Sequence, residues 1–220
     1  MNEIFIYDDI GPEWLGLVGS KSVMSELAKF KGKPVTVRIN SPGGDVVEAQ
    51  AIYNALRRHS DGGGQVTTEN DALAASAASF IFMAGDVRRV AENSMTMIHK
   101  AWSIAIGNAD EIRGTAGVLD KFDGILAETY AAASDKSADE IMELLAAETW
   151  LTAAEAMDLG LATEVGQPLN IAASVKPGRF AKTPDRILQR SLPTARETSR
   201  ASRIEQVQRE LRLSRARMGV

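Results

Sequence analysis

Short apolar runs and amphipathic stretches alternate along the first 170 residues of the chain. Runs rich in β-branched residues predict strands, because such side chains pack well on a pleated sheet; they fall at 4–7, 35–39, 65–68, 88–91 and 95–98. Stretches with apolar residues three or four positions apart predict helices over 20–30, 45–59 and 76–83. This alternation predicts an α/β layered fold rather than a bundle of helices.

A longer helix is predicted after the last of these strands. Asn108 and Glu111 form a capping-box pattern at its start. Apolar residues then recur at three- and four-residue steps, at Ile112, Leu119, Phe122, Leu126 and Tyr130. The stripe that they form must be covered, and another subunit is one candidate cover. Two further capping boxes predict shorter helices, at Ser137 with Glu140 and at Thr152 with Glu155.

The composition of the 220 residues excludes several classes of protein. Hydrophobic residues make up 45% of the chain and charged residues 25%, and no run of eighteen apolar residues occurs, so we expect no membrane span. Because the chain has no cysteine, disulfides, thiolate metal sites and cysteine nucleophiles are excluded. The first residues lack the basic-then-apolar layout of a secretory signal, and we expect a reducing, cytoplasmic location.

Charge is divided unevenly along the chain. Residues 1–170 hold 13 Lys and Arg against 25 Asp and Glu, a net charge of −12, whereas residues 171–220 hold 12 against 4, a net charge of +8. The second part is broken by prolines and then places Ile204, Val207 and Leu211 at helical spacing. We expect a folded domain over 1–170 and a basic linker with an amphipathic helix over 171–220. Four interpretations of this tail stay open: it is a solvated extension without a partner, or it binds nucleic acid, an acidic surface of a sister subunit or a capsid protein.

Two histidines are available for acid–base chemistry. His59 follows two arginines at the predicted end of a helix, where a cationic or hydrogen-bonding side chain has a structural role. His99 instead ends the apolar run of a predicted strand, a place where a rigid sheet can hold a catalytic group. His99 is therefore the candidate general base, and His59 is expected to be structural.

Two stretches could supply a nucleophile and an anion site. Ser76 lies among alanines just before an apolar helix, so a peptide could approach its hydroxyl and the helix N-terminus could face an oxyanion. A buried helix capped by this serine fits the same pattern. Gly43 and Gly44 lie between a strand and a helix, where glycine can present an unobstructed N–H to a ligand; a simple turn explains them almost equally well.

These stretches, in this order, resemble the Clp protease proteolytic subunit (ClpP) family of self-compartmentalised serine peptidases. The shared motifs are Asn-Ser-Pro-Gly-Gly at 40–44, a small-residue serine before a helix that ends Ala-Gly, Met-Ile-His at 97–99, and Glu-Thr-Trp-Leu-Thr-Ala-Ala-Glu-Ala at 148–156 before a Gly-Leu. The resemblance runs over about residues 38–165. It implies a layered fold of the ClpP and crotonase kind, with repeated β-β-α units and a protruding handle helix.

Carried over to this sequence, the resemblance implies a catalytic triad. Ser76 would be the nucleophile, His99 the general base, and Glu148 the acid that orients the imidazole. The family usually has aspartate where Glu148 stands, and the extra methylene lengthens its reach. Ser79, one helical turn beyond Ser76, is the second candidate nucleophile.

The resemblance also implies where the substrate binds. The backbone N–H groups of Gly44 and Ala77 would form the oxyanion hole. Gly43, Asp45 and Trp102 are the expected substrate-binding residues. Trp102 lies where the family has a Gly-rich, Pro-containing stretch after the histidine, so we expect a reshaped substrate pocket.

The implied partners are a protein or peptide substrate and further copies of the chain in a ring, as a heptamer or as two rings stacked through the long helix. An AAA+ unfoldase docks on housekeeping family members. This chain starts almost directly at its first strand, without the loop and helix that line the axial pore, which disfavours that partner. With a short N-terminal region and a basic C-terminal tail, the chain is similar to phage and prophage head-maturation proteases, which cleave scaffold and capsid precursors. No metal or organic cofactor is expected.

Two other functions stay open on the sequence alone. A crotonase-type acyl-CoA enzyme has the same layered fold and an N–H oxyanion hole, but it needs no serine–histidine pair. A catalytically inactive ring or assembly subunit would keep the scaffold without the chemistry. The deciding observation is whether Ser76, His99 and Glu148 lie within hydrogen-bond reach of one another.

Overall fold

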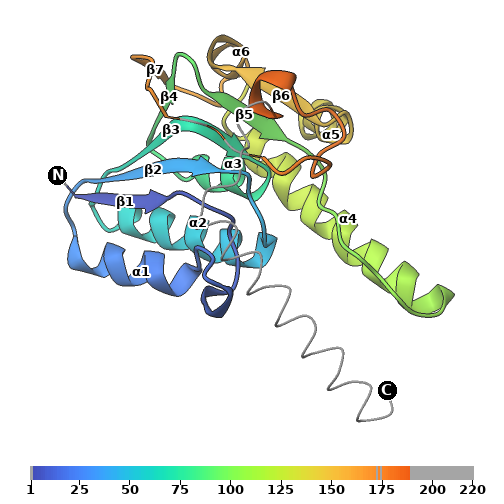
Figure 1. Cartoon of the computed structure of the whole chain (residues 1–220). Coiled ribbons are helices and arrows are strands. Elements are labelled where there is room, and N and C mark those ends of the chain that lie inside the picture. The colour runs from blue at the N-terminus through green and yellow to red at the C-terminus, as the bar shows by residue number, and fades with distance from the viewer. Residues whose placement is uncertain (1, 172, 174, 189–220) are drawn as a thin grey trace.

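The computed structural model describes residues 2–171, 173 and 175–188, and Figure 1 shows the path of the chain. Five parallel strands form the main sheet, in the order β1 (Glu3–Ile6), β2 (Val35–Ser41), β3 (Val66–Ala75), β4 (Val87–Ala91) and β7 (Glu164–Gly166). Two further strands extend it: β5 (Met95–Ile98) is parallel to the end of β3, and β6 (Thr149–Thr152) is antiparallel to β5.

Helices pack on one face of this sheet and extend from it (Figure 1). The packed helices are α1 (Ser20–Lys29), α2 (Val46–Asp61) and α3 (Ala77–Phe82). The long helix α4 (Ala109–Ala131) projects from the body, and its predicted capping box between Asn108 and Glu111 is present. The remaining helical segments are η1 (Glu13–Leu15), α5 (Ala138–Ala146), α6 (Ala153–Asp158) and α7 (Asp185–Leu188). The predicted α/β fold with a protruding helix is confirmed.

The sheet is buried on both faces over part of its area. Between the sheet and α1 to α3 lies the main core, which contains Ile6, Ile39, Ile52 and Ile81 at 0% exposure. On the opposite face, a smaller apolar cluster joins β3 and β5 to residues after β7; its buried members are Leu73, Ala75, Met95, Met97, Val175, Phe180 and Ile187. Part of the segment beyond Asn170 therefore packs against the sheet. The predicted tail helix with Ile204, Val207 and Leu211 lies outside the described residues, and the division of the chain there stays a prediction.

Most predicted elements begin and end within two residues of the observed ones, but β3 does not. It continues past Thr68 to Ala75, through the sequence Glu-Asn-Asp-Ala-Leu-Ala-Ala, which has no β-branched side chain. Local propensity for a strand is weak there. Pairing of Ala74 with Ser41 on β2 and of Leu73 with Met95 on β5 stabilises the extension. The strands β6 and β7 were not predicted. β7 is only three residues long, and β6 directly precedes the capping box of Thr152 and Glu155, which predicts a helix.

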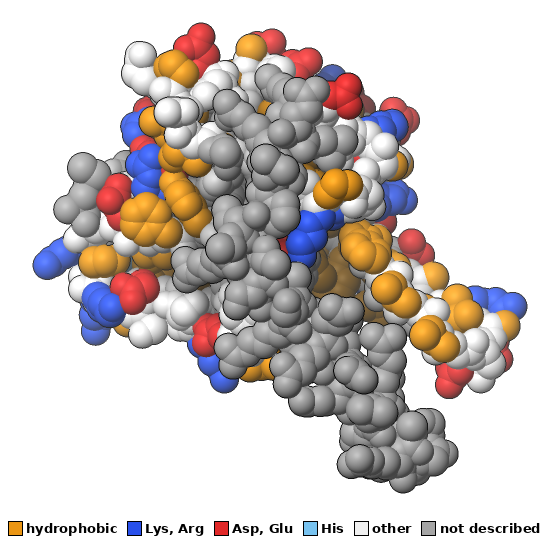
Figure 2. Space-filling view, viewed as in Figure 1, with side chains coloured by type: hydrophobic (Ala, Val, Ile, Leu, Met, Phe, Trp, Pro, Cys, Tyr) orange, Lys and Arg blue, Asp and Glu red, His pale blue; other side chains and the backbone are white. Residues whose placement is uncertain are grey.

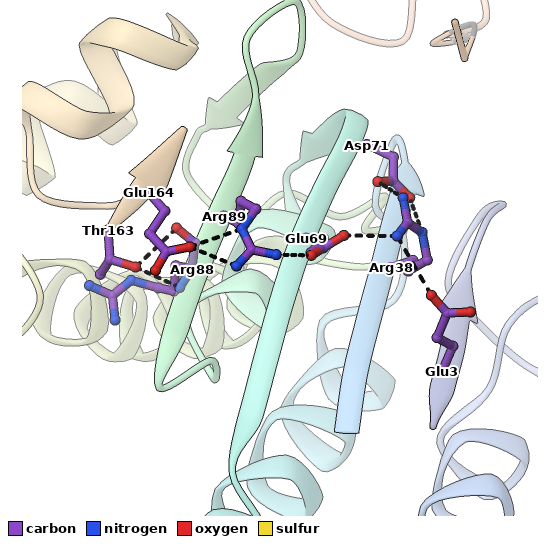
Figure 3. A network of polar contacts seen from close by, with 8 residues as sticks. All are labelled: Glu3, Arg38, Glu69, Asp71, Arg88, Arg89, Thr163 and Glu164. Atoms are coloured by element: carbon purple, nitrogen blue, oxygen red, sulfur yellow. Dashed lines mark hydrogen bonds and ion pairs between the residues drawn. The ribbon is translucent and has the colours of Figure 1, made fainter. Parts of the chain in front are cut away.

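A row of alternating charges crosses the face of the sheet opposite α1 to α3 (Figure 3). Arg38, Glu69, Arg89 and Glu164 are direct cross-strand neighbours on β2, β3, β4 and β7. Salt bridges join Arg38 to Glu69 at 2.8 Å and Arg89 to Glu164 at 2.7 Å, and Arg89 also pairs with Glu69. Opposite charges at paired positions favour this register of the strands.

Within the described part of the chain, no helix has the combination of length and apolar character that a membrane span needs.

Candidate active site

The carboxyl end of β3 holds Ser76 in a sharp turn. This residue occupies the single position between the last residue of β3 and the first residue of α3. Its backbone angles are φ 56° and ψ −127°, a conformation that non-glycine residues rarely adopt. The Ser76 N–H donates to the Met97 carbonyl oxygen at 2.9 Å, which ties the turn to β5. A strained strand-to-helix turn of this kind presents a serine hydroxyl at the edge of a sheet.

His99 follows β5 directly, and its ring reaches the serine. The distance from His99 Nε2 to Ser76 Oγ is 2.7 Å, that of a good hydrogen bond. Burial lowers the pKa of His99 below its ordinary value; the charge of Glu148 opposes this shift and the charge of Arg179 adds to it. The imidazole is therefore neutral near pH 7, and its Nε2 can accept the serine proton.

Glu148 lies in the turn between α5 and β6, where its φ is +50°. Its carboxylate accepts hydrogen bonds from the Lys182 N–H at 2.6 Å, the Ala181 N–H at 2.8 Å and the Trp150 indole N–H at 3.2 Å. Burial alone would raise the pKa of Glu148, but these donors outweigh it and the pKa is lowered. Among the described residues, neither carboxylate oxygen is hydrogen-bonded to His99, so the two side chains interact through charge.

Gly43 passes beside Ser76, and Gly44 passes beside Ile10, at separations that exclude other residues. A β-carbon on Gly43, at φ +87°, would lie 2.8 Å from both Ser76 Cβ and Ala77 N. A β-carbon on Gly44 would lie 2.0 Å from the Ile10 carbonyl oxygen. Both positions therefore require glycine, because a side chain at 43 would displace the backbone around Ser76 and one at 44 would displace the backbone of Ile10.

Two backbone N–H groups near Ser76 are candidates to hold an anion. The hydrogen bonds that connect the Gly44 strand to Ile10 use the N–H groups of Ile10 and Asp45, which leaves the Gly44 N–H outside this pairing. Ala77 is the first residue of α3, and a first helical residue has no intrahelical acceptor for its N–H. Both residues border the same cleft as Ser76.

That cleft has a volume of about 370 Å³. Most of the predicted site residues line it, namely Gly44, Asp45, Ser76, Ala77, His99 and Trp102. Gly43 lies behind Ser76, and Glu148 is not part of the lining. The Asp45 carboxylate accepts hydrogen bonds from the N–H groups of Val47 and Glu48, so it caps α2. Trp102 is 63% exposed.

The projecting helix supplies an apolar wall to the cleft. Val118, Leu119 and Phe122 of α4 line it together with the residues named above. The sequence placed Leu119 and Phe122 on the apolar stripe of this helix without assigning them to the site. An apolar side chain of a bound peptide could be desolvated against this wall.

Arg179 and Phe180 also line the cleft, although neither was predicted from the sequence to be a site residue. The Phe180 ring meets the His99 ring edge-on with centroids 5.4 Å apart, and it meets the Trp150 ring at 5.7 Å. Arg179 pairs with Asp9. The sequence around these two residues is basic and interrupted by prolines, which predicted a linker. Phe180 itself was the only sign in this segment that it packs against the domain.

The alternative candidates from the sequence have structural roles. Ser79 is completely buried, and its Oγ lies 2.8 Å from the Met97 carbonyl oxygen and 2.8 Å from the Tyr130 hydroxyl. It does not line the cleft, so a substrate could not reach it. His59 Nε2 lies 2.8 Å from the Lys33 carbonyl oxygen near the end of α2, as expected of a structural histidine.

Sequence comparisons relate the chain to one family of known proteins. A family model described as Clp protease matches residues 2–168. Proteins named ATP-dependent Clp protease proteolytic subunit from two strains of Bacteroides fragilis are each 34% identical to the chain over 136 residues, and one from Bacteroides thetaiotaomicron is 32% identical over the same length. The matched region covers 61% of this chain and 60 to 64% of the length of those relatives.

Proposed function

Because the chain belongs to the Clp protease family, we propose that it is a serine endopeptidase in which Ser76 is the nucleophile and His99 the general base. The observation that carries the proposal is the 2.7 Å contact between His99 Nε2 and Ser76 Oγ beside an open cleft. A crotonase-type acyl-CoA enzyme needs no such pair, so the contact favours the peptidase over that alternative.

The geometry supports the following sequence of proton transfers. Ser76 Oγ attacks the carbonyl carbon of the peptide while its proton passes to His99 Nε2. The resulting imidazolium then protonates the leaving amine as the C–N bond breaks. A water molecule, deprotonated by the same nitrogen, hydrolyses the acyl ester and regenerates the serine. A neutral imidazole is required at the start, and the burial that lowers the His99 pKa provides it.

The tetrahedral anion would be held by backbone N–H groups. Those of Gly44 and Ala77 border the cleft beside the serine and are not used by the surrounding backbone pairing. Removing one donor of an oxyanion hole typically costs roughly 2.7–4 kcal/mol of transition-state stabilisation. Glycine is then required at position 44 for two reasons: the backbone approaches Ile10 closely there, and the N–H must stay unshielded by a side chain.

Glu148 would act on the base rather than on the substrate. Its lowered pKa keeps the carboxylate ionised at neutral pH, and its charge favours the imidazolium that forms during the reaction. One more carboxylate lone pair could accept a hydrogen bond from His99 Nδ1, since catalytic hydrogen bonds often tighten only when substrate is bound. Glutamate in place of aspartate has the reach for this movement.

We also propose that the chain works as a ring of copies, a heptamer or two stacked heptamers. The projecting helix and the segment before it carry apolar side chains that stand in water in a single copy, and Figure 2 shows them as a row. They include Ile104 and Ile106 at 81% and 96% exposure, and Ile112 and Val118 at 45% and 49%. An apolar row of this kind is typical of a surface covered by another protein. A ring would admit unfolded chains to Ser76 and exclude folded proteins.

The tail contributes a proposal about partners. Residues 171–220 carry a net charge of +8, which suits an acidic protein surface such as that of a scaffold or capsid precursor. We therefore propose a head-maturation role in a phage or prophage, with cleavage in the cytoplasm. Cleavage of a co-expressed scaffold protein by the chain would support it; an uncleaved scaffold protein beside an assembled chain that hydrolyses casein would contradict it.

The peptidase proposal is tested with unfolded casein and short peptides as substrates. The assembled wild-type chain should hydrolyse them, and the Ser76→Ala chain should not. Absence of hydrolysis by a correctly assembled wild-type sample would favour the inactive ring subunit. Turnover of an enoyl-CoA by the Ser76→Ala chain would instead favour the crotonase-type enzyme.

A further inference from the structure

We propose that residues 179–182, here called the strap, are a positioning element of the active site that holds the Glu148 carboxylate and covers the His99 imidazole. The strap lies beyond residues 2–168, the region that matches the family. The inference rests on the proposed function and adds to it a segment that the sequence assigned to a linker. Four kinds of contact carry it.

The first is a pair of backbone hydrogen bonds to the acid. The Ala181 N–H donates to Glu148 Oε2 at 2.8 Å, and the Lys182 N–H donates to Glu148 Oε1 at 2.6 Å. Each oxygen is thus fixed by its own donor, and the plane of the carboxylate is set by the strap. An ionised carboxylate has about four acceptor positions, and three are used when the Trp150 indole is included. One position on Oε2 is left for an imidazole N–H.

The second contact covers the base. Phe180 is 7% exposed, and its ring stands edge-on to the His99 ring at 5.4 Å, with an interplanar angle of 80°. Water is therefore excluded from that side of the imidazole, and a desolvated histidine favours its neutral form. The strap acts in this way on both partners of the proposed acid–base pair.

The third and fourth contacts anchor the strap to the rest of the site. Phe180 is part of the apolar cluster under β3 and β5, with Leu73 and Met97. Arg179 pairs with Asp9, the residue before Ile10, whose carbonyl oxygen lies against Gly44. One short segment thus connects the acid, the base and the strand of the proposed oxyanion hole. Such convergence is expected of a positioning element and is not needed for a linker.

The charged groups around His99 determine how its pKa should change when the strap is altered. Glu148 and Asp123 carry negative charges that raise the histidine pKa, and Arg179 of the strap carries a positive charge that lowers it. Asp123 is buried on α4, where it accepts the Ala101 N–H at 2.7 Å and lies 3.6 Å from the Lys100 ammonium. Loss of the Phe180 ring would leave these charges in place and admit water. The His99 pKa would then rise toward its ordinary value.

The experiment compares full-length variants by the pH profile of kcat/KM on a short peptide. Phe180→Ala should lower kcat by about 10- to 100-fold and move the acid limb of the profile to higher pH. Phe180→Leu should restore most of the rate, because it refills the space above the imidazole. Ile187→Ala removes a side chain from the same apolar cluster without touching His99 or Glu148, and its acid limb should stay at the wild-type pH.

A second pair of variants tests the hydrogen bonds to Glu148. Lys182→Pro and Lys182→Ala both lose the ammonium group, but only the proline variant also loses the N–H that binds Oε1. We expect a larger fall in kcat for Lys182→Pro than for Lys182→Ala. Equal rates for Lys182→Pro and Lys182→Ala would overturn the proposal that the strap positions the Glu148 carboxylate.

Two outcomes for Phe180 would overturn the inference. A wild-type rate and profile in Phe180→Ala would show that the strap does not position the base, and a higher rate would show that it obstructs the site. Labelling of Ser76 by a fluorophosphonate in the wild-type chain separates this failure from that of the peptidase proposal. If Ser76 is labelled in the wild-type chain but the strap variants keep the wild-type rate and pH profile, only the strap inference is wrong. If Ser76 is not labelled in the wild-type chain, both the strap inference and the peptidase proposal are wrong.

Discussion

Gly43 lies directly against Ser76: a β-carbon on Gly43 would be 2.8 Å from Ser76 Cβ and 2.5 Å from the Ala75 carbonyl oxygen. The turn that presents the proposed nucleophile therefore depends on a residue 33 positions earlier in the chain. Because the obstructing atoms are mostly backbone, they cannot move without displacing Ser76 itself.

Replacing this glycine should impair catalysis more than an equivalent change elsewhere. Gly63 has nearly the same φ, +90° against +87°, but nothing lies within 4 Å of its missing β-carbon. Gly63→Ala should cost about 1–2 kcal/mol of unfolding free energy from left-handed strain alone and leave kcat unchanged. Gly43→Ala should cost more and lower kcat by about 100-fold, since it shifts the serine. Denaturant unfolding and peptide hydrolysis measure both quantities; equal effects of the two variants would contradict this relationship.

The acid limb of the pH profile should report the charges around His99. The histidine must be neutral to accept the serine proton, and burial places its pKa below the ordinary value, so activity should fall only below about pH 6.5. Glu148→Gln removes a charge that raises this pKa and should shift the limb to lower pH. Arg179→Gln removes a charge that lowers it and should shift the limb to higher pH.

The two shifts therefore have opposite signs, which a loss of stability would not produce. Glu148→Gln should also reduce kcat, by up to about 10⁴-fold if the carboxylate acts as a triad acid. The measurement is kcat/KM between pH 5 and 8 for the three chains. Shifts in the same direction would contradict the assignment of His99 as the base with these two charged neighbours.

The buried pair of Ser79 and Tyr130 should stabilise the fold and take no part in the chemistry. Their hydroxyl oxygens are 2.8 Å apart, and both residues are buried. Ser79→Ala leaves the tyrosine hydroxyl without this partner, at a cost of about 1–3 kcal/mol. In a double-mutant cycle with Tyr130→Phe, the pair should show a coupling energy of about 0.5–3 kcal/mol. Labelling of Ser76 should persist in Ser79→Ala, and its loss there would contradict the assignment of the nucleophile.

The apolar row on the projecting helix should be covered in solution. We expect a molecular mass several times the 23.7 kDa of one chain, as a seven- or fourteen-membered ring. Ile112→Glu places a charge in that row and should shift the mass toward smaller species, whereas Asp120→Asn, at an exposed polar position on the same helix, should not. Light scattering or native mass spectrometry makes the measurement. A wild-type sample that contains only the 23.7 kDa monomer would contradict the ring.

His99 could be singled out from the sequence because it ends a strand with a strong local signal, whereas Ser76 stood out through the small residues around it and the apolar helix that follows. That the two residues meet was implied by the resemblance to the ClpP family. The structure gives the physical reason, since parallel strands that share a sheet bring their carboxyl ends to one edge. The small residues beside Ser76 and the glycines at 43 and 44 added to the same inference. In the structure the three strand ends do lie together.

The environment of Glu148 could not be predicted from the sequence in the same way. Its partners Ala181 and Lys182 lie more than 30 positions later, in sequence that prolines and charges make resemble a linker. No periodicity marks a segment that packs through one aromatic ring and two backbone N–H groups. The end of β3 was predicted wrongly for a related reason. Its last residues form a strand because they pair with β2 and β5, and not because of their own strand propensity.

The central claim is that Ser76 is the nucleophile activated by His99, and the most direct measurement is the position of a covalent fluorophosphonate adduct, found by mass spectrometry of peptides from the digested protein. We predict a single adduct on Ser76, formed much more slowly in His99→Ala and not at all in Ser76→Ala. An adduct on another residue, or labelling that persists in Ser76→Ala, would contradict the account.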